Sequence, residues 1–121
     1  MAKYVDGYVI PIQKTKVKDY KKLATLGRKV WMEYGALDYY ECVGDALDSA
    51  WGLSFKKLCK LKANETLVFA FVVYKSKADR DRINAKVQQD PRMQPKPGKK
   101  FVMPFDLKRF STGGFKAIVS T

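Results

Sequence analysis

The side chains that could do chemistry in this chain are carboxylates, arginines and tyrosines, because its 121 residues include no histidine and only two cysteines. Without histidine the chain lacks the commonest general base and metal ligand, which excludes Ser-His-Asp and Cys-His nucleophiles and histidine-ligated zinc or haem. Two cysteines do not suffice for a structural zinc site within one chain. We therefore expect no metal site and no cofactor.

Two carboxylates and one arginine are the candidates for a catalytic role: Asp6, Glu41 and Arg109. Asp6 and Glu41 lie in segments that alternate as strands, on faces otherwise shared with Tyr, Leu, Val or Ile. A carboxylate on such a face lies either at the solvent edge or in a polar pocket. In a pocket, desolvation would raise its pKa and make it a plausible base.

A second set of residues could bind a ligand: Tyr8, Tyr39, Arg92 and Asp106. The tyrosines could stack on a planar ligand, or they could simply belong to the core or to an interface. Arg92 and Arg109 could hold a carboxylate or phosphate through two parallel hydrogen bonds. The alternative for these arginines is a local ion pair with Asp90 or Asp106.

The elements that must position these residues follow the order β-α-β-β-α-β. Alternation or apolar character indicates strands, and spacings of three and four indicate helices. The predicted strands are Tyr4–Ile12, Leu37–Val43, Glu65–Tyr74 and Phe110–Val119. The predicted helices run from a cap at Thr15 to a terminator at Gly35, and from Ser76 to Gln89 with Ala78, Ile83 and Val87 inward. The periodicity does not decide between strand and helix for Phe55–Leu61, and Asp90–Pro104 is predicted to be a loop.

This order predicts one domain over residues 1–121, of the α+β class, with the ferredoxin-like split βαβ arrangement and an antiparallel sheet. Two helices cover one face of such a sheet, yet Glu65–Tyr74 is apolar on both faces. A half-covered sheet should alternate apolar with polar residues. We therefore expect a second copy to pack sheet to sheet as a homodimer; the alternative is that the C-terminal loop covers this face.

The charge is strongly positive, with 24 Lys and Arg against 12 Asp and Glu, for a formal net charge of +12. Much of the excess lies in the runs Lys56–Lys62 and Arg92–Lys100. Such runs attract polyanions without specificity, and no RNP-type, KH or OB pattern accompanies them. No apolar run reaches the roughly 20 residues of a membrane span, so we expect a cytoplasmic protein with Cys42 and Cys59 as reduced thiols.

Several ordered segments together resemble the YbaA-like family of uncharacterised bacterial proteins over nearly the whole chain. They are Tyr4-Val5-Asp6-Gly7, Gly35-Ala36-Leu37, Glu41-Cys42, Gly44-Asp45, Glu65-Thr66-Leu67-Val68-Phe69, Tyr74-Lys75-Ser76-Lys77-Ala78, Arg80-Asp81, Asp90-Pro91-Arg92-Met93, Met103-Pro104-Phe105-Asp106, Lys108-Arg109 and Gly113-Gly114-Phe115. The segment from Ala46 to Ser54, with Trp51, departs from the Pro-Asp-Gly-type loop of that family, and the chain is also more basic.

The resemblance implies a dimeric α/β barrel, in which two ferredoxin-like sheets pair face to face. The wider superfamily includes cofactor-independent monooxygenases, haem-degrading enzymes, dehydratases and small-ligand sensors. The family itself has no established reaction, so no catalytic residue carries over from it.

Three functions therefore remain open. The first is binding of a small apolar or anionic ligand, with or without cofactor-independent catalysis. The second is a non-catalytic dimeric interaction module. The third is RNA or polyanion binding through the basic runs.

Overall fold

Four strands form one antiparallel sheet in the order β2-β3-β1-β4 in the computed structural model, which describes residues 2–99 and 102–121. The strands are β1 (Tyr4–Gln13), β2 (Asp38–Val43), β3 (Glu65–Tyr74) and β4 (Ser111–Lys116). The helices are α1 (Val17–Glu33), α2 (Phe55–Leu58) and α3 (Lys77–Gln89), with short 3-10 turns at Lys14–Lys16 and Pro91–Met93. This is the predicted α+β ferredoxin-like topology, and α2 is an added turn of helix between β2 and β3.

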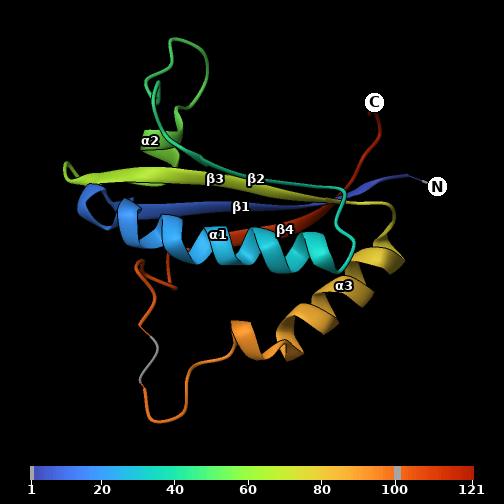
Figure 1. The fold of residues 1–121 in the computed structure, drawn as a ribbon. Coiled ribbons are helices and arrows are strands. Elements are labelled where there is room, and N and C mark those ends of the chain that lie inside the picture. The colour runs from blue at the N-terminus through green and yellow to red at the C-terminus, as the bar shows by residue number, and fades with distance from the viewer. Residues whose placement is uncertain (1, 100–101) are drawn as a thin grey trace.

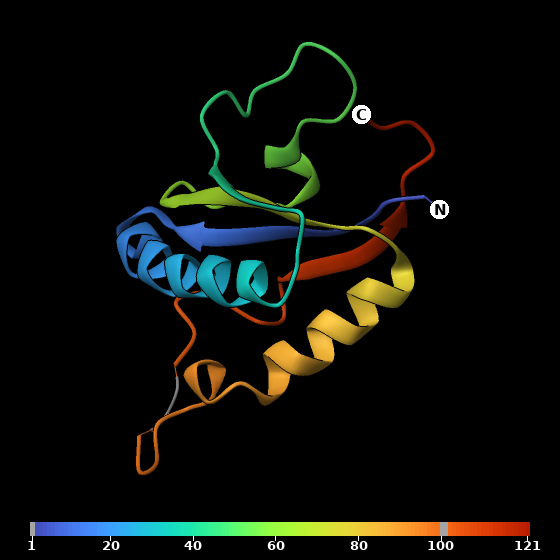
Figure 2. The same cartoon turned by 45° about the vertical axis from the view of Figure 1, so that its right-hand side comes forward.

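The two long helices cover one face of the sheet, which we call the helix face. Figures 1 and 2 show α1 and α3 on this side and α2, with the connection over residues 44–54, on the other. The core lies under the helices in two groups of buried side chains. One group is Val30, Ala36, Val72, Tyr74, Ile83 and Val87, and the other is Ile10, Ile12, Tyr20, Val68 and Ala70.

Two of the three residues that were predicted to begin or end a helix do so in the structure. Gly35 terminates α1 in the left-handed region, at φ 111°, where glycine has no steric penalty. Ser76 caps α3, because its hydroxyl accepts a hydrogen bond from the Asp79 N–H at 3.1 Å. The predicted cap at Thr15 is wrong: the turn at Lys14–Lys16 precedes α1, which begins at Val17 without a side-chain cap.

Three other expectations need correction or completion. The last strand ends at Lys116, and Ile118 and Val119 beyond it are almost fully exposed. In α3, Ile83 and Val87 are buried as predicted, but Ala78 faces solvent. The undecided segment Phe55–Leu61 contains the single helical turn of α2, which Ser54 caps.

The second face of the sheet, which we call the open face, is apolar and only partly covered in the single chain, where Phe55 of α2 lies against Phe69 with ring centroids 6.4 Å apart. The strand register places these side chains on it: Val5, Val9, Tyr40, Cys42, Phe69, Phe71, Val73 and Phe115. Tyr40 stacks on Phe71 with ring centroids 5.1 Å apart. The described residues between α3 and β4, 90–99 and 102–110, lie on the helix side (Figure 1), where several of them line the cavity described below, and so do not cover the open face. The alternative of a covering C-terminal loop is therefore wrong.

None of the helices among the described residues is both long and apolar enough to cross a membrane.

Candidate ligand-binding site

A cavity of about 630 Å³ lies on the helix face, between the sheet, α1 and the segment that connects α3 to β4. Its lining includes members of both groups of core side chains, Val72 from the first and Ile10, Tyr20 and Ala70 from the second. Most of the lining is apolar or aromatic, which is typical of sites for small organic molecules. The aromatic lining residues on this face of the sheet are Tyr8, Tyr20, Trp31, Tyr39, Phe105 and Phe110.

Glu41 is the one carboxylate among the described lining residues, and two tyrosines hold it. Tyr20, from α1, donates to Oε1 at 2.6 Å, and Tyr39, from β2, donates to Oε2 at 2.7 Å. Tyr39 and Glu41 are two residues apart on a strand and therefore point to the same face, towards α1. The carboxylate thus has a fixed position in a mostly apolar wall.

Tyr20 and Tyr39 stay protonated through the neutral range, so they act as donors to Glu41. Burial is the main cause that raises the pKa of Tyr39 and of Tyr20 well above the ordinary value, and the hydrogen bonds to Glu41 add to it. Burial likewise raises the pKa of Tyr8 to about 12, with further contributions from the charges of Asp6 and Glu41.

Gly27 allows α1 to lie close enough to the sheet for this arrangement. A Cβ atom at Gly27 would lie 2.8 Å from the Tyr39 hydroxyl oxygen. We expect Gly27→Ala to lower the free energy of unfolding by about 1–2 kcal/mol, because overpacking outweighs the better helix propensity of alanine. In a Tyr39→Phe background, which lacks the obstructing hydroxyl, the same change should raise stability by up to about 1 kcal/mol.

Urea denaturation of the four proteins in this double-mutant cycle measures the coupling between Gly27 and Tyr39. Additive effects of the two changes would show that the hydroxyl does not limit the approach of α1.

Arg92 lies at the edge of the cavity but is already engaged by carboxylates. Its Nε and Nη2 donate to the two oxygens of Asp90 at 3.0 and 2.9 Å, and Nη2 also lies 2.8 Å from Glu33. Asp90 additionally accepts from the Tyr34 hydroxyl at 2.7 Å. The Arg92 hydrogen bonds, with that of Tyr34, hold the pKa of Asp90 well below its usual range. Of the two roles considered for Arg92, ligand binding and a local ion pair, the structure shows the ion pair, with Asp90.

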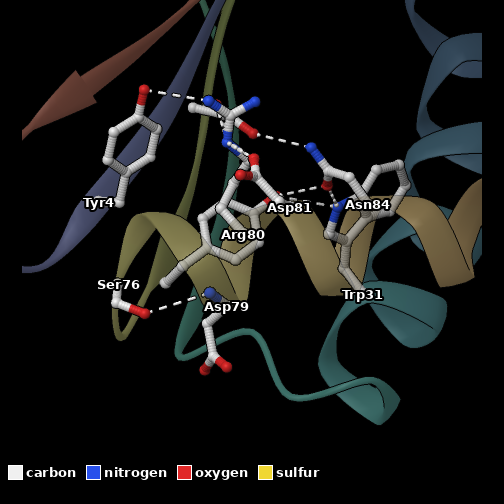
Figure 3. Close-up of polar contacts among 9 residues, drawn as sticks. Tyr4, Trp31, Ser76, Asp79, Arg80, Asp81 and Asn84 are labelled. Carbon is white, nitrogen blue, oxygen red and sulfur yellow. Dashed lines mark hydrogen bonds and ion pairs between the residues drawn. The ribbon is translucent and has the colours of Figure 1, made fainter.

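Asp6 is not among the lining residues of the cavity; it is buried in a polar network that joins β1 to α3, in which Figure 3 labels Arg80, Asn84 and Trp31. Asp6 accepts from the Asn84 amide at 3.2 Å and lies 3.8 Å from Nε of Arg80. Asn84 in turn accepts from the Tyr74 hydroxyl and from the Trp31 indole N–H, at 2.9 and 3.1 Å. The network therefore fixes the Trp31 ring, which is part of the cavity wall.

Arg109 and Asp106 lie at a different place, beside a second hollow of about 690 Å³ at one end of the sheet. Arg109 donates to Glu65 at 2.5 Å and to the carbonyls of Cys59 and Lys60, both at 3.1 Å. The Asp106 side chain accepts from the Lys108 N–H at 2.9 Å and closes a local turn. Arg109 thus forms an ion pair, but with Glu65 instead of Asp106.

The structure brings four of the seven candidate residues to one cavity: Glu41, Tyr8, Tyr39 and Arg92. Sequence reasoning missed Tyr20, Gly27 and Asn84. Tyr20 was visible as a phenol within the apolar stripe of α1, and a buried phenol needs a hydrogen-bond partner. Within the described residues, no group of three or more Cys, Asp or Glu side chains is arranged to hold a metal ion.

Comparison with known proteins gives a family and a fold. A sequence model of the family described as "Protein of unknown function (DUF1428)" matches residues 3–107. The "Uncharacterized protein YbaA" of Escherichia coli strain K12 is 37% identical over 119 residues, 97% of each chain, and the Shigella flexneri protein of that name gives the same values. These matches confirm the resemblance seen in the ordered segments.

Among solved structures, a dimeric ferredoxin-like protein from an uncultured marine organism aligns over 100% of both chains. Its TM-score is 0.55 and its sequence identity 12%, so this likeness shows the fold alone.

Proposed function

The chain belongs to the DUF1428 family of proteins of unknown function, and from its cavity we propose that it binds a small, largely apolar molecule. The observation that carries the proposal is one carboxylate, Glu41, held by two tyrosines in an otherwise mostly apolar cavity of about 630 Å³. This volume lies within the range of roughly 300–1,000 Å³ typical of ligand pockets. Aromatic walls favour a planar ligand.

Glu41 gives the bound molecule its orientation. Its carboxyl oxygens accept a hydrogen bond from a ligand N–H or O–H. It is also the group in the described lining that would accept a proton if the ligand reacts, since Tyr20 and Tyr39 beside it hold their own protons at neutral pH. A cofactor-independent proton transfer is therefore the reaction that this cavity would support.

Binding is tested with 2-naphthol, a planar probe with one hydroxyl donor, followed by its fluorescence and by the melting temperature of the protein. We expect saturable binding that weakens at least about tenfold in Ala24→Leu, because the larger side chain on α1 fills the cavity. Ala78→Leu makes the same change at an exposed position of α3 and should leave binding unchanged.

Equal binding by Ala24→Leu and the unmodified protein would place the probe elsewhere. Failure of 2-naphthol and of planar carboxylates to bind at all would contradict the proposed function.

We also propose that two copies pair through their open faces as a homodimer. Supporting this, Tyr40, Phe69 and Phe115 are about half exposed or more on that face, and the fold neighbour described above is a dimer. A contiguous exposed apolar surface of this kind is typical of an interface. The cavity lies on the opposite face of the sheet, so pairing leaves it free. If the chain is a homodimer, light scattering should give the mass of two chains.

A polyanion role has less support. The lysines around α2 and the basic residues that follow α3 lie on opposite sides of the sheet (Figure 2), so the two runs do not form one continuous surface. We also propose a cytoplasmic location. Cys42 and Cys59 are unpaired thiols, and cysteines of cytoplasmic proteins are usually reduced.

A further inference from the structure

We propose that the ligand of this cavity carries a hydrogen-bond donor at one end and an anionic group at the other. The donor meets Glu41 on the sheet, and the anion meets Lys96 and Lys99 on the segment that follows α3. This inference rests on the proposed function, because it concerns the same cavity.

The negatively charged and the positively charged lining residues lie on different walls of the cavity. The acid, Glu41, comes from β2, whereas the three cations, Arg92, Lys96 and Lys99, all come from residues 92–99. Figure 2 shows this segment leaving the end of α3 on the side away from the sheet. A molecule held between the two walls therefore meets a negative charge on one side and positive charges on the other.

Glu41 has room for a further donor. Each of its oxygens accepts one tyrosine hydroxyl, while an ionised carboxylate offers about four acceptor sites in all. A ligand O–H or N–H that reaches the cavity wall can use an unfilled site. A ligand anion in the same place would instead be repelled by the carboxylate.

The two lysines differ from Arg92 in having no carboxylate partner. Arg92 is bound to Asp90 and Glu33, but neither Lys96 nor Lys99 forms an ion pair with any described residue. Two unpaired ammonium groups beside an apolar cavity attract an anion and repel a cation. A carboxylate, with one negative charge, or a phosphate, with about 1.5–2 negative charges at neutral pH, would pair with them.

The test uses four naphthalene probes that share one ring system and differ in their polar groups. They are 2-naphthol (donor only), 2-naphthoate and 2-naphthyl phosphate (anion only), and 6-hydroxy-2-naphthoate (donor and anion at opposite ends). We expect 6-hydroxy-2-naphthoate to bind at least about tenfold more tightly than 2-naphthol or 2-naphthoate. Comparison of 2-naphthoate with 2-naphthyl phosphate identifies the preferred anion.

Two variants separate the two ends of the ligand. Lys96→Gln/Lys99→Gln should reduce the affinity for 6-hydroxy-2-naphthoate to that for 2-naphthol and leave 2-naphthol itself unchanged. Glu41→Gln should weaken the probes that carry a hydroxyl and not the anion-only probes. Lys57→Gln/Lys75→Gln removes the same charge from exposed positions outside the cavity, so its affinities should match those of the unmodified protein.

The inference is wrong if 2-naphthol and 6-hydroxy-2-naphthoate bind equally well, or if the control variant weakens anion binding as much as the Lys96/Lys99 variant does. In both cases the cavity still binds a planar molecule and the proposed function stands. If no probe binds, the proposed function fails as well.

Discussion

Replacing Asp6 with alanine should lower the free energy of unfolding by about 3–5 kcal/mol, because it removes the buried carboxylate that faces the buried Nε atom of Arg80. Asp6 is 5% exposed. Nε of Arg80 is buried and has no hydrogen-bond partner among the described residues, and of the two carboxylates within 4 Å of it Asp6 is the buried one. For a chain of this length the loss corresponds to a fall in melting temperature of about 12–20 °C. Circular dichroism during heating or in urea measures it.

Asp81→Ala is the matched control, since Asp81 also contacts Arg80 and lies closer to it. The distance to Nε is 3.3 Å for Asp81 and 3.8 Å for Asp6, but the Asp81 side chain is 60% exposed. Exposed ion pairs contribute about 0–1 kcal/mol, so Asp81→Ala should have a small effect. Equal losses in the two variants would show that burial does not determine the contribution of this ion pair.

Replacing Phe69 with lysine should convert the proposed dimer into a monomer that remains folded. Phe69 lies on β3 in the open face and is 45% exposed in the single chain. Pairing of two open faces would bury the new ammonium groups without a partner, which strongly opposes association. Light scattering should then give the mass of one chain instead of two.

Cys42 provides a second measurement at the same interface. It lies opposite Phe69 in the strand register and is exposed in the single chain. In a Cys59→Ser background, a thiol reagent should modify Cys42 at least about tenfold faster in Phe69→Lys than in the dimer, because access limits the reaction. Leu107→Lys, an exposed position in the segment before β4, should change neither mass nor rate. A monomeric parent protein with a fast-reacting Cys42 would contradict the dimer.

The fold could be predicted because its signals are local. Period-two alternation in β1 and β2, the apolar run of β3, the apolar stripe of α1 and the Ser76 cap each depend on neighbours within a few residues. Errors arose where a segment lacked such a signal. Thr15 has a suitable side chain for a cap, but the chain makes a 3-10 turn there instead. The apolar residues after Lys116 continue the strand pattern although no described strand pairs with them.

The site could be predicted only in part, because its partners are distant in the sequence. Glu41 and Tyr39 were found as polar residues on a predicted strand. Their closeness to Tyr20 depends on how α1 packs on the sheet, which no local pattern specifies. The same holds for Asp6 with Asn84, which lie 78 residues apart. Residue type indicated which groups could do chemistry, and the packing of α1 and α3 determined which of them meet.

The segment that forms the cavity wall opposite the sheet has an arginine–carboxylate ion pair near each of its two ends. Arg92 binds Asp90 before it and Arg109 binds Glu65 after it, and these partners hold the pKa values of both carboxyls below their usual range. Both ion pairs therefore keep their charges in mildly acidic solution. Lys96 and Lys99 lie between them and outside the hydrophobic core. If the proposed site binds its anion through these lysines, substitutions there would change the ligand with little effect on folding, so related proteins could keep this fold and bind different molecules.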